Sequence, residues 1–265
     1  MSAVDPASFP LSANLLRKLV ENQKGESMSN RVTVSRREFF PLAALGLSLA
    51  TPLGRRAFAD DTANAGKQVS PDEALRQLLE GNQRFVNGKT TGPRRDPQSF
   101  QPLAAGQYPE AVIVSCADSR VAPEILFDVG IGDIFVIRVA GNVVRNSGVV
   151  VRGSIEYAVA ELKVPLIMVL GHSACGAVKA AKQHVDAKDS LPGAIDGLVE
   201  LIKPAVTESK AEPGDPLENA IRKNVQIGVE KLKQSEPIFA PRVKEGKLKI
   251  VGAVYDLANG TVKIV

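Results

Sequence analysis

Two cysteines are the residues of this 265-residue chain best suited to bind a metal, and each follows an apolar run and has polar neighbours. Cys116 lies in the stretch SCADSR, and Cys175 lies in GHSACG, three residues after His172. On a turn that leads into a helix, side chains three residues apart can face the same point. Two thiolates and one imidazole are a suitable ligand set for zinc, with a fourth position left open as in catalytic sites. The pattern therefore favours a catalytic zinc site at these three residues.

Two simpler interpretations of the cysteines compete with a metal site. Two cysteines in an exported protein often form a disulfide, which here would join Cys116 to Cys175. Alternatively, both cysteines are small buried residues at strand ends. Neither interpretation requires a histidine three residues before Cys175 or an Asp-x-Arg sequence beside Cys116. The only other histidine, His184, lies in a lysine-rich predicted helix, and we expect it at the exposed surface.

Asp118 and Arg120 place an acidic and a basic group next to Cys116. They lie two residues apart, so on an extended segment both side chains can point the same way. An arginine within reach keeps an aspartate ionised and fixes its orientation. Beside a zinc-bound water, that aspartate can accept the proton, hydrogen-bond the resulting hydroxide, or bind the zinc and close the site. The alternative is a surface salt bridge that contributes little.

The segments that carry these residues belong to a predicted series of strands and helices. Ser70 begins a helix, with Pro71 at its first position and Glu73 completing a capping box. Beyond it, apolar runs typical of strands alternate with segments whose apolar residues have helical spacing. The predicted strands are 110–115, 133–140, 165–171, 247–257 and 261–265, and the predicted helices are 147–162, 174–184, 194–206 and 215–234.

This alternation predicts an α/β fold with a mainly parallel central sheet that is flanked by helices on both faces. A turn at Asn259 and Gly260 leads to the last strand, which we predict to be an antiparallel edge strand at the C-terminus. Cys116 and His172 then follow the carboxyl ends of parallel strands. Open α/β sheets place their ligands at that edge.

The distribution of charge argues against nucleic acid as a partner. The formal net charge of the chain is +4. Residues 1–59 contain eight Lys/Arg and four Asp/Glu, so residues 60–265 contain 25 of each and are neutral. The sequence has no basic stripe with interleaved aromatic residues. The Gly-x-Gly at 130–132 precedes a strand and lacks the third glycine of a nucleotide-binding fingerprint, so it predicts a turn.

The excess positive charge lies in an N-terminal leader, residues 1–59. Arg36 and Arg37 precede a modest apolar run, and the small residues Ala57 and Ala59 follow it, which is the layout of an export signal. The pattern resembles a twin-arginine signal, which directs the export of proteins that have already folded. We therefore expect an exported, periplasmic protein that is cleaved after Ala59.

The apolar run of the leader, 39–53, contains two prolines and falls short of the ~20 residues of a membrane span, so we predict no stable span in the mature chain. Met28 could be the true start, because it places the arginine pair about ten residues in. An amphipathic N-terminal helix with a chance arginine pair is the alternative. A polar linker at 60–69 and a catalytic domain at 70–265 complete the predicted organisation.

The sequence Cys-x-Asp-x-Arg followed by His-x-x-Cys resembles the signature of the β-class carbonic anhydrases at every named position. The similarity extends from about residue 70 to the C-terminus. It includes the stretches LLEGNQRFVNGK, SRVAPEILFDVGIGDIFVIRVAGN and VLGHSACGAVKAA. The family fold is a mainly parallel sheet flanked by helices. Its minimal unit is a dimer, so the resemblance implies a homodimer or a higher homo-oligomer.

The resemblance implies an enzyme that reversibly hydrates carbon dioxide to bicarbonate. It also implies one zinc per subunit, bound by Cys116, His172 and Cys175. Asp118, paired with Arg120, would orient the zinc-bound hydroxide that attacks carbon dioxide. In a closed state, Asp118 would instead occupy the fourth zinc position.

A glutamine of the family has a counterpart in Gln107, nine residues before Cys116. The family residue donates a hydrogen bond to bound substrate, commonly across a dimer interface. Some bacterial members bind bicarbonate at a second site that includes a tryptophan, and this chain has no tryptophan, so we do not expect that regulation. Other relatives hydrolyse carbon disulfide or carbonyl sulfide with the same ligands, and that activity is the alternative within the family.

Overall fold

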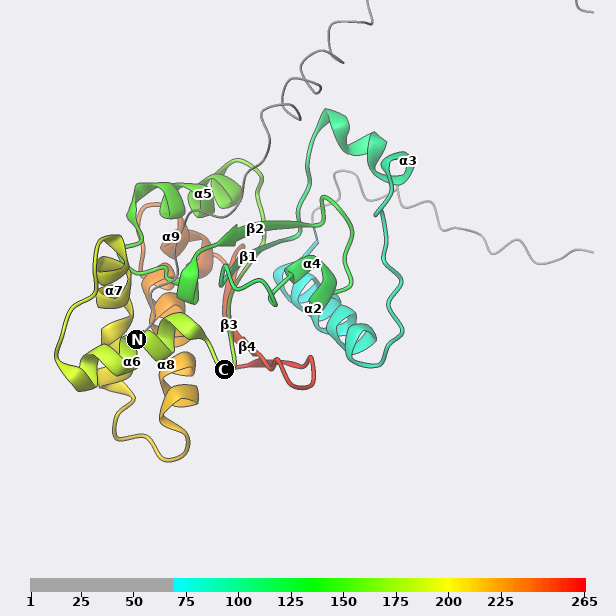
Figure 1. Ribbon diagram of the computed structural model, residues 1–265. Coiled ribbons are helices and arrows are strands. Elements are labelled where there is room, and N and C mark those ends of the chain that lie inside the picture. Colours follow the sequence, from blue (N-terminus) through cyan, green and yellow to red (C-terminus); the bar gives the residue numbers. More distant parts are fainter. Residues whose placement is uncertain (1–68) are drawn as a thin grey trace, which may run out of the picture. The chain divides into compact units, whose positions relative to one another are not determined.

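The computed structural model describes residues 69–265, which form a five-stranded sheet with helices on both sides (Figure 1). The strand order is β2-β1-β3-β4-β5, and all pairings are parallel except that of β4 with β5. The strands are β1 Ala111–Ser115, β2 Ile134–Arg138, β3 Leu166–His172, β4 Lys249–Tyr255 and β5 Val262–Ile264. The predicted α/β fold with an antiparallel C-terminal edge strand is confirmed.

Helices connect the parallel strands and cover both faces of the sheet. The helices are α2 Pro71–Val86, α3 Pro97–Phe100, α4 Pro123–Leu126, α5 Gly148–Ala160, α6 Gly176–Ala187, α7 Ala194–Glu208, α8 Pro216–Lys233, α9 Phe239–Lys244, and the 3₁₀ helices η2 Gln101–Ala105 and η3 Ala140–Asn142. The sequence did not predict α3, α4 or α9, because four to six residues are too few to show a helical apolar stripe.

Helix α2 begins where the sequence predicts. The side chain of Ser70 accepts a hydrogen bond from the backbone N–H of Glu73, and Pro71 occupies the first position. The reciprocal half of the capping box does not form, because the Glu73 carboxylate instead accepts hydrogen bonds from the side chains of Arg76 and Gln77.

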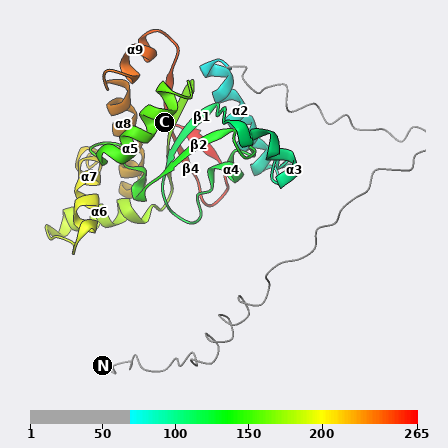
Figure 2. The ribbon, with the colours of Figure 1, turned by 90° about the horizontal axis from the view of Figure 1, so that it is seen from above.

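The central strands are apolar on both faces because helices cover both faces, as Figure 2 shows from above. All residues of β1 and β3 are buried. In β1, Val112 and Val114 pack in one apolar cluster with Ile155 of α5. Ile113 points to the opposite face, where it packs in a second cluster with Leu78 of α2. This double covering explains why the strands are continuous apolar runs rather than alternating ones.

The leader predicted at 1–59 and nearly all of the linker predicted at 60–69 lie outside the described residues. The boundaries of the leader, the linker and the catalytic domain therefore remain predictions. Within residues 69–265, no helix combines the length and the apolarity that a membrane crossing needs.

Candidate metal centre

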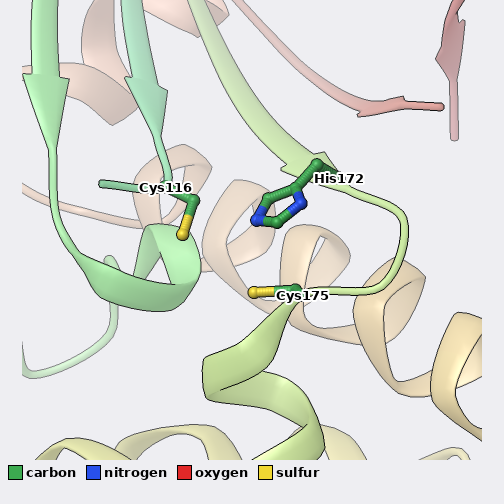
Figure 3. Close-up of side chains that lie close together, drawn as sticks. All are labelled: Cys116, His172 and Cys175. Atoms are coloured by element: carbon green, nitrogen blue, oxygen red, sulfur yellow. The ribbon is translucent and has the colours of Figure 1, made fainter. Parts of the chain in front are cut away.

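The carboxyl ends of β1 and β3 and the start of α6 bring three side chains together (Figure 3). Cys116 directly follows β1, His172 is the last residue of β3, and Cys175 is the N-cap of α6. Strands β1 and β3 are hydrogen-bonded neighbours, with Ser115 opposite Leu170, so their ends lie side by side. The two sulfurs and a ring nitrogen of the histidine all lie within 4.8 Å of one another. The structure thus brings together the three residues predicted as zinc ligands.

Both cysteines are buried and free, so no disulfide joins Cys116 to Cys175. The disulfide interpretation is therefore wrong for this structure. The other interpretation, two small buried residues at strand ends, explains their burial. It does not explain why a fully buried histidine ring faces both sulfurs in Figure 3.

One ring nitrogen of His172 makes a hydrogen bond, and the other has no hydrogen-bond partner. Nδ1 lies 3.0 Å from the carbonyl oxygen of Ser173, so Nδ1 carries the proton and donates it there. Nε2 is buried, and it has no hydrogen-bond partner. An unpaired buried acceptor is costly, and a cation between Nε2 and the two sulfurs would remove that cost. The donor set fits zinc, which prefers sulfur and imidazole ligands.

Hydrogen bonds favour a thiolate at Cys116. The thiol of Cys175 contributes most to lowering the pKa of Cys116, and the backbone N–H groups of Gly141 and Asp118 add to it, against the opposing effect of burial. The N–H groups of Gly141 and Asp118 lie 3.2 Å and 3.4 Å from Cys116 Sγ. The contact with Cys116, together with burial, raises the pKa of Cys175. Cys116 is thus the sulfur that loses its proton more readily, and a bound cation would favour loss of the proton from Cys175 as well.

Asp118 lies beside the cluster and is held by Arg120. Asp118 Oδ1 accepts hydrogen bonds from the Arg120 backbone N–H at 3.0 Å and from Nε at 2.9 Å, and Oδ2 accepts one from Nη2 at 2.7 Å. These bonds lower the pKa of Asp118 well below its usual range, with burial opposing. Oδ2 lies 3.8 Å from Nε2 of His172. The carboxylate is therefore ionised, and both of its oxygens are engaged by Arg120.

The sequence and the fold of this chain match those of a known enzyme family. The family model described as Carbonic anhydrase matches residues 111–262. Carbonic anhydrase 2 of Mycobacterium tuberculosis is 43% identical over 193 residues, which cover 72% of this chain and 91% of that protein. This chain belongs to the β-carbonic anhydrase family.

Other relatives of this β-carbonic anhydrase support the same family. The carbonic anhydrase of Mycolicibacterium smegmatis is 40% identical over 195 residues, covering 74% of this chain and 93% of that protein. The solved structure of a Coccomyxa β-carbonic anhydrase in complex with acetazolamide aligns with a TM-score of 0.56 and 29% identity, covering 72% and 86% of the two chains. A tetrameric β-carbonic anhydrase from Sordaria macrospora aligns with a TM-score of 0.57 and 28% identity, covering 73% and 97%.

Arg138 is a site-supporting residue that the sequence analysis missed. Its Nε donates to the carbonyl oxygen of Cys116 at 3.1 Å, and its Nη2 donates to the carbonyl oxygen of Asp118 at 2.6 Å. Arg138 ends β2, directly opposite Ser115 in the parallel register with β1. It therefore fixes the backbone of the segment that carries Cys116 and Asp118. A charged residue at the end of an apolar run was the available signal.

The short loop between His172 and Cys175 is also fixed by distant parts of this carbonic anhydrase. The N–H of Ser173 donates to the carbonyl oxygen of Tyr255, and its hydroxyl accepts from the N–H of Leu257, both at 2.9 Å. Ala174 has a positive φ of 52°, unusual for a residue other than glycine. These contacts determine where Cys175 enters α6.

Gln107 lies in a different part of the chain from the metal centre. Its neighbour Tyr108 lines a cavity together with Ala111 and Ile134, the first residues of β1 and β2, whereas Cys116 follows the far end of β1. Five residues of strand separate these ends by about 16 Å. Gln107 is exposed. The structure does not bring it to the metal centre of its own chain.

His184 lies outside the cluster, but the expectation that it is exposed is wrong. Its side chain is 20% exposed. Nδ1 lies 2.5 Å from Asp189 Oδ1, and this contact holds the ring against the end of α6.

Proposed function

We propose that this chain uses zinc, one ion per subunit, bound by Cys116, His172 and Cys175, to hydrate carbon dioxide reversibly to bicarbonate and a proton. Membership of the β-carbonic anhydrase family supports the reaction. The observation that carries the proposal is the buried cluster of two sulfurs and one unpartnered imidazole nitrogen, with an ionised carboxylate beside it.

Different residues of the chain have distinct roles in this reaction. Zinc, when bound, supplies a Lewis acid that makes water a nucleophile near neutral pH. The bond from His172 Nδ1 to Ser173 keeps Nε2 free to bind the metal. Asp118 Oδ2, ionised by its contact with Arg120, is placed to accept a proton or to orient the attacking oxygen. Because Arg120 engages both oxygens of Asp118, the residues that would hold the zinc in this arrangement are Cys116, His172 and Cys175 without Asp118.

Stopped-flow measurement of carbon dioxide hydration by the full chain, purified with zinc and assayed near pH 8.5, tests this function. We expect a fast rate that a zinc-binding inhibitor abolishes. A zinc-loaded protein without that rate would contradict the proposal. If the same sample then hydrolysed carbon disulfide or carbonyl sulfide, the alternative activity within the family would be established.

We also propose that Gln107 donates a hydrogen bond to substrate in the site of a second subunit, within a homodimer or a larger homo-oligomer. The exposure of Gln107, and its place at the end of β1 far from Cys116, support a role across an interface. We expect Gln107→Ala to lower kcat/KM about 10-fold or more, because a hydrogen bond to an anion is lost. Gln101→Ala, a change of another exposed glutamine on η2, should leave kcat/KM unchanged.

Mixed dimers distinguish a role across the interface from one within the chain. A dimer of one Gln107→Ala subunit and one Cys175→Ser subunit contains one complete site if the glutamine comes from the partner. We expect this mixed dimer to be active, whereas each variant alone has little activity. An inactive mixed dimer, or a monomeric protein by analytical ultracentrifugation, would contradict the proposal.

We propose further that the protein is exported to the periplasm by a twin-arginine signal and cleaved after Ala59. The pair Arg36 and Arg37, the apolar run and the small residues near Ala59 support this. Export after folding would carry the thiolates across within their zinc bonds, protected from oxidation. Replacing both arginines by lysine in a bacterial host with that pathway should retain the protein in the cytoplasm. An unchanged periplasmic fraction would refute the signal.

A further inference from the structure

Gly141 connects the metal centre to a helix distant in the sequence. Its backbone N–H donates to Cys116 Sγ at 3.2 Å. Its carbonyl oxygen accepts a hydrogen bond of 2.8 Å from Nδ2 of Asn224, in the middle of α8. Asn224 is buried, and 83 residues separate it from Gly141. One residue thus links the amide of Asn224 to the sulfur of a predicted zinc ligand.

The backbone at this point adopts a left-handed conformation at two successive residues. Gly141 has a φ of +71°, and the next residue, Asn142, has a φ of +45°. A Cβ on Gly141 would lie 2.7 Å from Cδ1 of Ile202 and 3.2 Å from Cβ of Ala177, and the positive φ would strain any other residue, so the position favours glycine. Glycine adopts this region of φ without strain, but it is also the most flexible residue, so the surrounding contacts must fix the orientation of its peptide groups. Asn224 supplies a directional hydrogen bond that does so, because it fixes the carbonyl oxygen of Gly141.

We propose that Asn224 is a positioning residue of the metal centre. By holding the carbonyl of Gly141, it fixes the orientation of the Gly141 N–H that donates to Cys116 Sγ. This inference rests on the proposed zinc site. An N–H donor withdraws electron density from a thiolate, so Asn224 sets how strongly Cys116 donates to the metal. Residues that orient metal ligands in this way typically change metal affinity by about 10- to 100-fold when they are replaced.

The matched control for Asn224 is Asn219, on the same helix. Asn219 is also buried, and its side-chain amide donates to the carbonyl oxygens of Glu212 at 3.1 Å and Pro213 at 3.0 Å. It supports the loop before α8 rather than the metal centre. A merely structural effect of losing a buried asparagine should therefore be the same in Asn219→Ala and Asn224→Ala.

The test compares the full-length wild type with both variants by two measurements. Zinc affinity is measured by competition with a chelator, and the thiolate-to-metal charge-transfer band is recorded with Co²⁺ in place of zinc. We expect Asn224→Ala to bind zinc about 10- to 100-fold more weakly, because Cys116 Sγ is no longer held in its binding position and this loss outweighs the stronger donation of the freed thiolate. Its charge-transfer band should move to longer wavelength, because a thiolate without its N–H donor gives up electrons more easily. Asn219→Ala should leave both unchanged.

The outcomes separate this inference from the zinc assignment. Wild type that binds neither metal would overturn both. Metal binding and spectra that are the same in the wild type and Asn224→Ala would overturn the role of Asn224 alone, and so would equal changes in the two variants. If Asn224→Ala does not fold, Asn224→Leu removes the donor and keeps the volume. In addition, wild type loaded with ¹¹³Cd should show scalar coupling between the metal and the Gly141 amide proton, and its absence would overturn the proposed contact.

Discussion

Replacing Cys175 by serine is expected to remove zinc and carbon dioxide hydration together. A serine hydroxyl stays protonated at neutral pH and cannot replace an anionic sulfur ligand. The remaining Cys116 and His172 are too few for a catalytic site with three protein ligands. Replacing a residue that only orients a metal ligand lowers metal affinity or activity about 10- to 100-fold. Loss of a ligand itself should therefore lower zinc affinity and rate by more than about 100-fold. Metal analysis by mass spectrometry and stopped-flow kinetics on the same sample measure both.

The two histidines of the chain provide a matched control for this experiment. His172→Ala should reproduce the loss seen in Cys175→Ser, because both changes remove a ligand from the same cluster. His184→Ala removes a ring that pairs with Asp189 at the end of α6 and should keep zinc and rate. If Cys175→Ser retained both zinc and activity, the assignment of the metal centre would fail.

Replacing Asp118 by asparagine is expected to retain zinc and lose about 100-fold or more in rate, because the ionised carboxylate that orients the attacking oxygen is lost. Asparagine keeps the size of the side chain but can neither accept a proton nor carry the charge that pairs with Arg120. Zinc should remain because the three clustered ligands do not include Asp118. Zinc content and hydration rate, measured on one preparation, separate loss of chemistry from loss of metal.

The low pKa of Asp118 determines how the role of its carboxylate depends on pH. Arg120 stabilises the carboxylate, so Asp118 is ionised at every pH above its ordinary value of about 4. The ion pair therefore stabilises the fold fully above that pH, and this stability is lost only as pH falls through the lowered pKa. Between pH 6 and 9 the wild type should show no change that arises from Asp118. Raising the pH in this range should not rescue Asp118→Asn.

The control for Asp118→Asn is Asp186→Asn, which removes an exposed carboxylate that pairs with Lys182 on α6. Exposed pairs of this kind contribute little, so we expect the wild-type rate. An Asp118→Asn protein that retained zinc and hydrated carbon dioxide at the wild-type rate would show that Asp118 has no part in the chemistry.

The sequence by itself determined the local features of this protein. Strands β1 and β3 are continuous apolar runs, and Cys116 and His172 follow directly where those runs end, so the motif could be located without coordinates. The pairing of Asp118 with Arg120 was also predictable, because they lie two positions apart in the sequence. Short separations constrain geometry strongly through the backbone alone. The parallel sheet followed from the alternation of strands and helices.

Tertiary structure alone decided the contacts that hold the site in place. Arg138 reaches Cys116 only because β2 and β1 are paired in a register that sets Ser115 opposite Arg138. Asn224 reaches Gly141, 83 positions before it in the chain, only because α8 packs against β3 and β4. The spacing of residues in the sequence does not predict such contacts. They depend on how helices pack on the faces of the sheet and on which strands are neighbours.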